Sequence, residues 1–153
     1  MSKTKRLLWE RSAGEDELDE IGCLIASELK ELNWFCLWME GPLGAGKTSL
    51  SRHILQALGL SKHIPVSSPT FSVLNEYEID GKLYAHLDLY RIEGFFDVED
   101  LGLVSERSFS GLFVEWPSKV EDDLLIPSHL IKISREKDNV DLRTYSFYSL
   151  QTK

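Results

Sequence analysis

The feature that most constrains the fold is a glycine-rich segment at residues 41–48, GPLGAGKT. An uncharged run at 34–39, WFCLWM, precedes it, and residues 47–58 follow with a helical pattern that ends at Gly59. A short uncharged run without alternation is typical of a strand buried on both faces, as in a parallel sheet. Glycine just past the last helical residue is a common helix end. The order strand, glycine-rich loop and helix predicts an α/β fold.

The same segment has the G-x-x-x-x-G-K-[ST] spacing of a phosphate-binding loop, or P-loop. Glycines let successive backbone N–H groups turn inward toward phosphate oxygens, and a following helix N-terminus favours anions. Lys47 would add a positive charge for the phosphates, and the Thr48 hydroxyl is a hard ligand suited to Mg²⁺. The residues predicted to bind the nucleotide are Gly41, Pro42, Leu43, Gly44, Ala45, Gly46, Lys47, Thr48 and Ser49.

The remaining sequence predicts one more long helix and several strands. Residues 15–32 carry apolar side chains at three- and four-residue spacing, which predicts an amphipathic helix. Residues 71–79 and 82–89 have the pattern of two strands joined by a hairpin turn at Asp80-Gly81. A short acidic helix or turn is predicted at 95–103, and further strands are predicted at 112–116, 130–134 and 143–148. We therefore expect a single P-loop NTPase-like domain over residues 1–153, with a mixed parallel and antiparallel sheet flanked by helices.

Composition limits the classes of protein to consider. The formal net charge is −8, which argues against a protein whose main task is to grip a nucleic-acid backbone. No apolar run approaches the roughly 18 residues of a membrane span, and the N-terminal apolar stretch is too short for a signal peptide. The two cysteines, Cys23 and Cys36, match no metal-binding or redox spacing and are predicted to be buried, reduced thiols. These patterns predict a cytoplasmic protein that does not act at a membrane.

Two carboxylates end apolar strands and are candidates for work on a bound nucleotide. Asp88 closes the strand YAHLD, and Glu115 closes LFVE, so both would lie at the sheet edge where the P-loop lies. Either one could instead be a solvated acid at a strand end, and the sequence does not divide the roles between them. Thr70, in the turn SPTF, could reach the terminal phosphate and Mg²⁺ as switch loops do, or could simply lead into a strand. His86 is interpreted as a structural histidine in preference to a base.

Four segments in this order and spacing resemble one known family. They are 41–48, then SPTF at 68–71 with Tyr77, then HLDLYR at 86–91, and VEW at 114–116. Over roughly residues 15–116 the set resembles the bacterial TsaE (YjeE-type) ATPases of tRNA threonylcarbamoyladenosine biosynthesis. The resemblance implies a small P-loop α/β domain that binds ATP with Mg²⁺ and hydrolyses it slowly. It also implies two partner proteins, subunits of the tRNA threonylcarbamoyl-transferase complex, which modifies adenosine 37 of tRNAs that read codons beginning with A. Hydrolysis would reset that complex, and contact with tRNA would be only indirect.

The resemblance also assigns roles to single positions. Lys47 and the loop amides match the positions that hold phosphates, and Thr48 and Glu115 match the metal-binding positions. Asp88 matches the acidic catalytic position, and Thr70 the switch-like position. The catalytic residues predicted in this way are Lys47, Asp88, Glu115 and Thr70. Trp116 matches the aromatic residue that follows the metal-binding acid, although the residue pattern alone would place it in the core.

Two other functions use the same loop. A small-molecule P-loop kinase usually brings arginines from a lid to the transferred phosphate. The candidate arginines of this chain are scattered along the sequence: Arg91, Arg107, Arg135 and Arg143. A non-catalytic adaptor would use ATP only to order a docking surface, and both strand-end carboxylates would then be bystanders.

Overall fold

The computed structural model describes residues 3–69, 73–90, 109–117 and 126–152 of the 153-residue chain. Thr70 and the segment 95–103 therefore lie outside the described residues. In chain order the elements are β1 (Lys3–Ala13), a short 3-10 helix η1 (Glu15–Glu17), α1 (Leu18–Leu29), β2 (Phe35–Glu40), α2 (Lys47–Leu58), β3 (Leu74–Ile79), β4 (Lys82–Asp88), β5 (Gly111–Glu115), β6 (His129–Arg135) and β7 (Arg143–Thr152).

The strands form one mixed sheet in the order β1-β7-β6-β2-β5-β4-β3. At its centre β2 pairs in parallel with both β5 and β6, and β4 pairs in parallel with β5. The outer pairs are antiparallel: β1 with β7, β7 with β6, and β3 with β4. The predicted mixed α/β architecture is confirmed, and the parallel centre brings the carboxyl ends of β2, β4 and β5 to one edge of the sheet.

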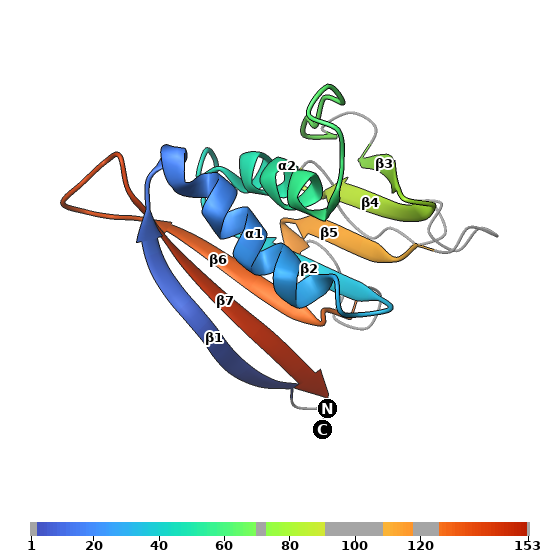
Figure 1. Cartoon of the computed structure of the whole chain (residues 1–153). Helices are drawn as coiled ribbons and strands as arrows, with labels where there is room; N and C mark the ends of the chain where they lie inside the picture. The colour runs from blue at the N-terminus through green and yellow to red at the C-terminus, as the bar shows by residue number, and fades with distance from the viewer. Residues whose placement is uncertain (1–2, 70–72, 91–108, 118–125, 153) are drawn as a thin grey trace.

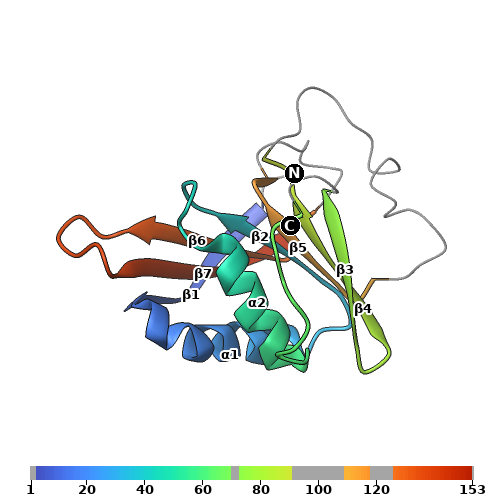
Figure 2. The same ribbon diagram turned by 90° about the horizontal axis from the view of Figure 1, so that it is seen from above.

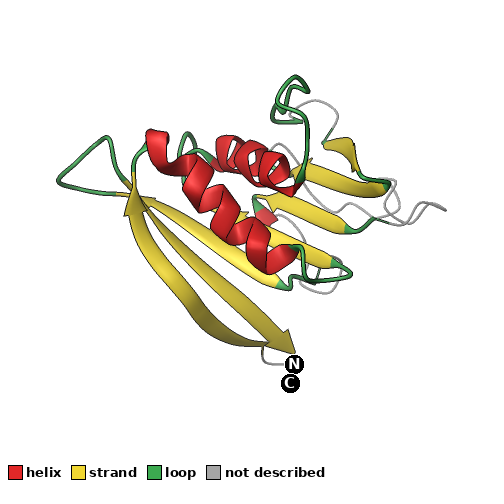
Figure 3. Ribbon diagram, viewed as in Figure 1, coloured by secondary structure: helices red, strands yellow, loops and turns green. Residues whose placement is uncertain are grey.

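Both described helices lie side by side on the same face of the sheet (Figures 1 and 2). Figure 3 shows this arrangement as a pair of helices over a continuous layer of strands. The main apolar core fills the space between them, with fully buried side chains from both helices and from the central strands, among them Ile21, Ile54 and Phe113. The prediction that helices flank the sheet therefore holds for one face within the described residues.

α1 shows how the local sequence sets a helix boundary. Residue Gly14 donates its backbone N–H to the Glu17 carboxylate at 2.8 Å, and the intervening turn is a 3-10 helix, so α1 begins only at Leu18. The helix is shorter than the predicted 15–32. Its buried residues recur at i, i+3 and i+4 and so form one face, as predicted for an amphipathic helix. They are Leu18, Ile21, Gly22, Ile25, Ala26 and Leu29.

Gly22 sets how closely the two helices approach. A Cβ added at this position would lie 2.9 Å from the backbone carbon and oxygen of His53 in α2. Gly22→Val is therefore expected to force the helices apart and to destabilise the fold by about 2–3 kcal/mol, the usual effect of overpacking a core. Thermal unfolding should show a fall in Tm of roughly 5–10 °C. The control is Cys23→Ala at the next, exposed position, and equal melting temperatures for the two variants would contradict this account.

Several predicted elements are confirmed and others are corrected. α2 spans the predicted residues 47–58, and Gly59 follows it with φ +123°. The β3–β4 hairpin turns at Asp80 and Gly81, with φ +50° and +78°. Alternate residues of β4 are buried on both faces, because Tyr84 packs into the core beneath the helices and Ala85 and Leu87 pack into a second apolar cluster. The prediction that both cysteines are buried is wrong for Cys23, which is exposed on α1. Neither described helix combines the length and apolar character needed to cross a membrane.

Candidate functional site

The P-loop connects the end of β2 to the first turn of α2, as the sequence predicts. Gly44 and Gly46 have φ of +77° and +101°, a left-handed conformation that residues with a Cβ rarely adopt. Gly41 is required for a different reason: a Cβ there would lie 2.9 Å from the backbone oxygen of Ile133 in β6. Gly46 is also the N-cap residue of α2, so the loop delivers its backbone amides to the positive end of a helix.

Lys47 is nearly inaccessible to solvent, with 5% of its surface exposed. Its Nζ donates hydrogen bonds to the backbone oxygens of Gly41 at 2.7 Å and Pro42 at 3.1 Å. The same atom lies 4.0 Å from the centroid of the Trp116 ring. Burial lowers the pKa of Lys47, whereas the nearby carboxylates of Glu115 and Asp88 raise it. The ammonium group is thus placed inside the loop, next to the two predicted acids.

Glu115 and Thr48 meet at the carboxyl end of β5. The Thr48 hydroxyl lies 3.0 Å from one carboxylate oxygen of Glu115 and 3.2 Å from the other. The second contact of Glu115 comes from His86, whose Nε2 is hydrogen-bonded to Oε2. Parallel pairing sets Met39 of β2 opposite Glu115, which brings this carboxylate level with the start of the P-loop. The two residues that the resemblance assigns to the metal, Thr48 and Glu115, are therefore in contact.

Asp88 lies beside Glu115 because β4 and β5 pair in parallel with these residues opposite each other. One Asp88 oxygen accepts a hydrogen bond from the Ser68 hydroxyl, and the other accepts the backbone N–H of Tyr90 at 3.0 Å. Its side chain is partly exposed, unlike that of Glu115. Asp88, the more exposed of the two carboxylates, is thus held by a hydrogen bond from the loop that follows α2.

These groups line one pocket of about 260 Å³. Its lining residues are Leu43, Gly44, Gly46, Lys47, Thr48, Ser49, Ser68, Asp88, Tyr90, Glu115 and Trp116. Trp116 has φ +59°, and its ring lies 4.8 Å from that of Tyr90. The expectation that Trp116 packs in the core needs correction: the ring contacts an apolar cluster, and it also forms a pocket wall over Lys47. Ser68 and Tyr90 are site residues that the sequence analysis did not single out.

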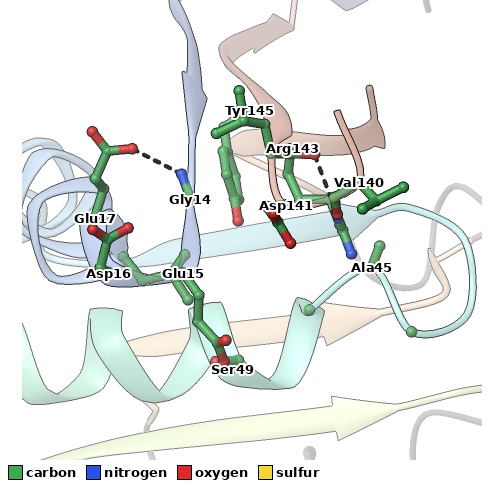
Figure 4. A pocket seen from close by; sticks show the side chains of 14 residues that line it. Gly14, Glu15, Asp16, Glu17, Ala45, Ser49, Val140, Asp141, Arg143 and Tyr145 are labelled. Atoms are coloured by element: carbon green, nitrogen blue, oxygen red, sulfur yellow. Dashed lines mark hydrogen bonds between the residues drawn. The ribbon is translucent and has the colours of Figure 1, made fainter. Parts of the chain in front are cut away.

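A second and larger pocket, about 890 Å³, lies on the other side of the P-loop (Figure 4). Three segments that are distant in the sequence meet there: residues 14–18 around η1, the P-loop with Ser49, and the loop between β6 and β7. Its rim carries four carboxylates and one guanidinium group: Glu15, Asp16, Glu17, Asp141 and Arg143. Gly44, Gly46 and Ser49 line both pockets, so the two adjoin at the N-terminus of α2.

Two of the scattered arginines lie beside the P-loop. Arg135, at the end of β6, donates from Nη2 to the backbone oxygen of Leu43 at 2.9 Å. Arg143 donates from Nη1 to the backbone oxygens of Val140 and Leu142 at 2.8 and 3.1 Å (Figure 4). Both guanidinium groups thus stabilise loop conformations around the site. Arg91 and Arg107 lie outside the described residues.

The donor set fits magnesium held together with a phosphate. Mg²⁺ is usually bound by one or two carboxylates plus substrate phosphates and water, and not by a cage of protein ligands. In the described part of the chain no three His, Cys, Asp or Glu side chains gather to form such a cage. A hydroxyl and a carboxylate, from Thr48 and Glu115, lie instead next to the phosphate-binding loop.

Known proteins resemble this chain both in sequence and in structure. Residues 12–145 match the model of the family described as threonylcarbamoyl adenosine biosynthesis protein TsaE. The tRNA threonylcarbamoyladenosine biosynthesis protein TsaE of Bacillus subtilis is 35% identical over 94% of this chain and 85% of its own length. The protein of the same name from Aquifex aeolicus is 32% identical over 80% and 87%.

A solved structure is also similar to almost the whole of this chain. The crystal structure of Bacillus subtilis YdiB matches with a TM-score of 0.65 at 25% identity, over 97% of this chain and 86% of that one. The family match also continues past Trp116 to residue 145, beyond the segment in which the sequence motifs lie. The chain therefore belongs to the TsaE family of threonylcarbamoyl adenosine biosynthesis proteins.

Proposed function

We propose that this protein binds ATP with Mg²⁺ at the P-loop and hydrolyses it. The observation that carries the proposal is the contact between the Thr48 hydroxyl and the Glu115 carboxylate beside the buried Lys47 ammonium. A cation, a hydroxyl and a carboxylate at one helix N-terminus form the donor set that P-loop NTPases use.

Each residue then has a chemical task. The loop amides and Lys47 hold the negatively charged phosphates, and Lys47 exchanges its bonds to the Gly41 and Pro42 oxygens for phosphate oxygens. Thr48 and Glu115 would hold Mg²⁺, which neutralises phosphate charge when it is bound. Asp88 is the more exposed carboxylate, and its remaining lone pairs can orient a water molecule and accept its proton. The Trp116 ring limits the access of other water molecules to Lys47.

We assign the nucleoside to the larger pocket. It adjoins the P-loop through Gly44, Gly46 and Ser49, and its volume of about 890 Å³ lies within the usual range for small-molecule sites. The phosphates would then extend over the N-terminus of α2 into the smaller pocket, where Asp88 and Glu115 lie. In this arrangement the cleaved phosphate would lie next to the two carboxylates.

The cellular role that we propose follows from family membership. The protein would support formation of the threonylcarbamoyl group on adenosine 37 of tRNA in the cytoplasm. It would act with two subunits of the transferase complex, and slow ATP hydrolysis would reset that complex. A net charge of −8 suits a subunit that contacts proteins and meets tRNA only indirectly.

Equilibrium binding of a fluorescent ATP analogue tests the nucleotide site. We expect binding to tighten when Mg²⁺ is added, and ATP and ADP to compete far better than AMP, because Lys47 and Thr48 line the smaller pocket that we assign to the outer phosphates. Inorganic triphosphate should compete more weakly than ATP, because it leaves the larger pocket unfilled. A protein that binds none of these compounds, or that binds AMP as tightly as ATP, would contradict the proposal.

A further inference from the structure

We infer that His86 is a positioning residue that fixes the orientation of the Glu115 carboxylate for magnesium. The inference rests on the proposed function, since it concerns how the chain holds a ligand of that metal. His86 itself lines neither pocket, so its effect on the site would pass through Glu115, which lines the smaller one. Three features of the structure support this role.

The first feature is the shared face of the two strands. Alternate residues of a strand point to the same side, so His86 and Asp88 of β4 share a face, as do Phe113 and Glu115 of β5. Phe113 belongs to the core beneath the helices, which places all four side chains on the side of the sheet that carries α2. His86 is therefore directed toward Glu115 from within the sheet, whereas Thr48 approaches the carboxylate from α2.

The second feature is the shortage of donors around a buried charge. Glu115 is 3% exposed, and a buried carboxylate requires hydrogen-bond donors. The Thr48 hydroxyl has one proton and can satisfy only one of the two oxygens that it approaches. Nε2 of His86 supplies the second donor at Oε2. Without it the carboxylate would keep a single side-chain tether, and its plane could turn.

The third feature is the orientation of the histidine ring. A carboxylate oxygen accepts and does not donate, so Nε2 carries the proton in this contact. The other ring nitrogen, Nδ1, is buried and has no hydrogen-bond partner within the described ranges. The polar contact found for this fully buried side chain is thus the one with Glu115, which gives the imidazole a positioning role beyond its packing.

The test is a magnesium titration of nucleotide binding, which does not depend on hydrolysis. His86→Leu removes the donor, His86→Asn keeps a polar group that is too short to reach Glu115, and His86→Gln can place an amide N–H near the Nε2 position. We expect the Leu and Asn variants to need about 10- to 100-fold more Mg²⁺ for half-maximal enhancement, the usual effect of removing a partner of a metal ligand. His86→Gln should stay close to wild type, and nucleotide affinity in EDTA should be unchanged in all three.

His129→Leu is the matched control. His129 is also buried, 5% exposed, and its Nε2 lies 3.5 Å from the Glu28 carboxylate, away from the P-loop. This variant should lose stability without any change in magnesium dependence. If His86→Leu does not fold, the Asn and Gln variants carry the comparison.

Two results would overturn the inference. In one, His86→Asn titrates with Mg²⁺ like wild type. In the other, the Asn and Gln variants lose nucleotide affinity equally in EDTA, which is the behaviour of a structural residue. Failure of the proposed function would be visible earlier and separately, as wild-type protein that shows no effect of Mg²⁺ on nucleotide binding.

Discussion

Glu115→Gln is expected to slow magnesium-dependent ATP hydrolysis by about 100- to 1,000-fold, the size of effect that follows when one group that stabilises a transition state electrostatically is removed. The amide keeps the size of the side chain and can still bond to Thr48, but it loses the negative charge that would bind the metal. The buried position of Glu115 strengthens the effect, because electrostatic interactions are stronger where water is excluded.

The matched control for this variant is Glu78→Gln, an exposed carboxylate on the edge strand β3. It carries the same chemical change away from the pocket and should hydrolyse ATP like wild type. Nucleotide binding in EDTA should be retained by both variants, because the phosphates are held by the loop and Lys47. If Glu115→Gln keeps more than half of the wild-type rate, Glu115 is not the metal-binding acid, and the assignment would pass to Asp88.

Lys47→Ala is expected to weaken ATP binding by about 100-fold, since it removes the buried positive charge that faces the phosphates. Isothermal titration calorimetry would measure the change directly. The loss should be larger for ATP than for AMP, because Lys47 lies in the smaller pocket, which we assign to the outer phosphates.

Lys62→Ala provides the control, since this lysine is exposed in the loop after α2 and lines neither pocket. The melting temperature of Lys47→Ala should remain near that of wild type, because the two loop oxygens bound by Nζ can take water in its place. Wild-type ATP affinity in a folded Lys47→Ala protein would remove the basis of the proposed function.

The centre of the fold could be predicted from the sequence because its signals are local. The run at 34–39, the glycine-rich loop and the pattern at 47–58 specify β2, the P-loop and α2 within a few neighbouring residues. β1 was missed because its signal is not local. Its charged residues and the irregular register between Leu7 and Trp9 break the alternation of a strand, and within the described residues it pairs with β7, at the opposite end of the chain.

The candidate site likewise contains some residues that local sequence signals identify and others that only the folded structure brings together. Thr48, Asp88 and Glu115 could be proposed because a P-loop and two strand-end acids meet at one edge of a parallel sheet. The contact of His86 with Glu115 depends on the relative register of β4 and β5, which no local pattern specifies. The larger pocket could not be predicted for a similar reason, because residues near 15, 45 and 141 come together only in the folded sheet.

The most direct test of the central claim is the rate of ATP hydrolysis with Mg²⁺ by the purified protein, alone and with the two transferase subunits. Lys47→Ala should be measured in parallel under both conditions. The account predicts slow hydrolysis by the protein alone, stimulation by the two subunits, and loss of both rates in the variant. A stimulated rate that Lys47→Ala leaves unchanged, or ATP binding without hydrolysis in either condition, would contradict it.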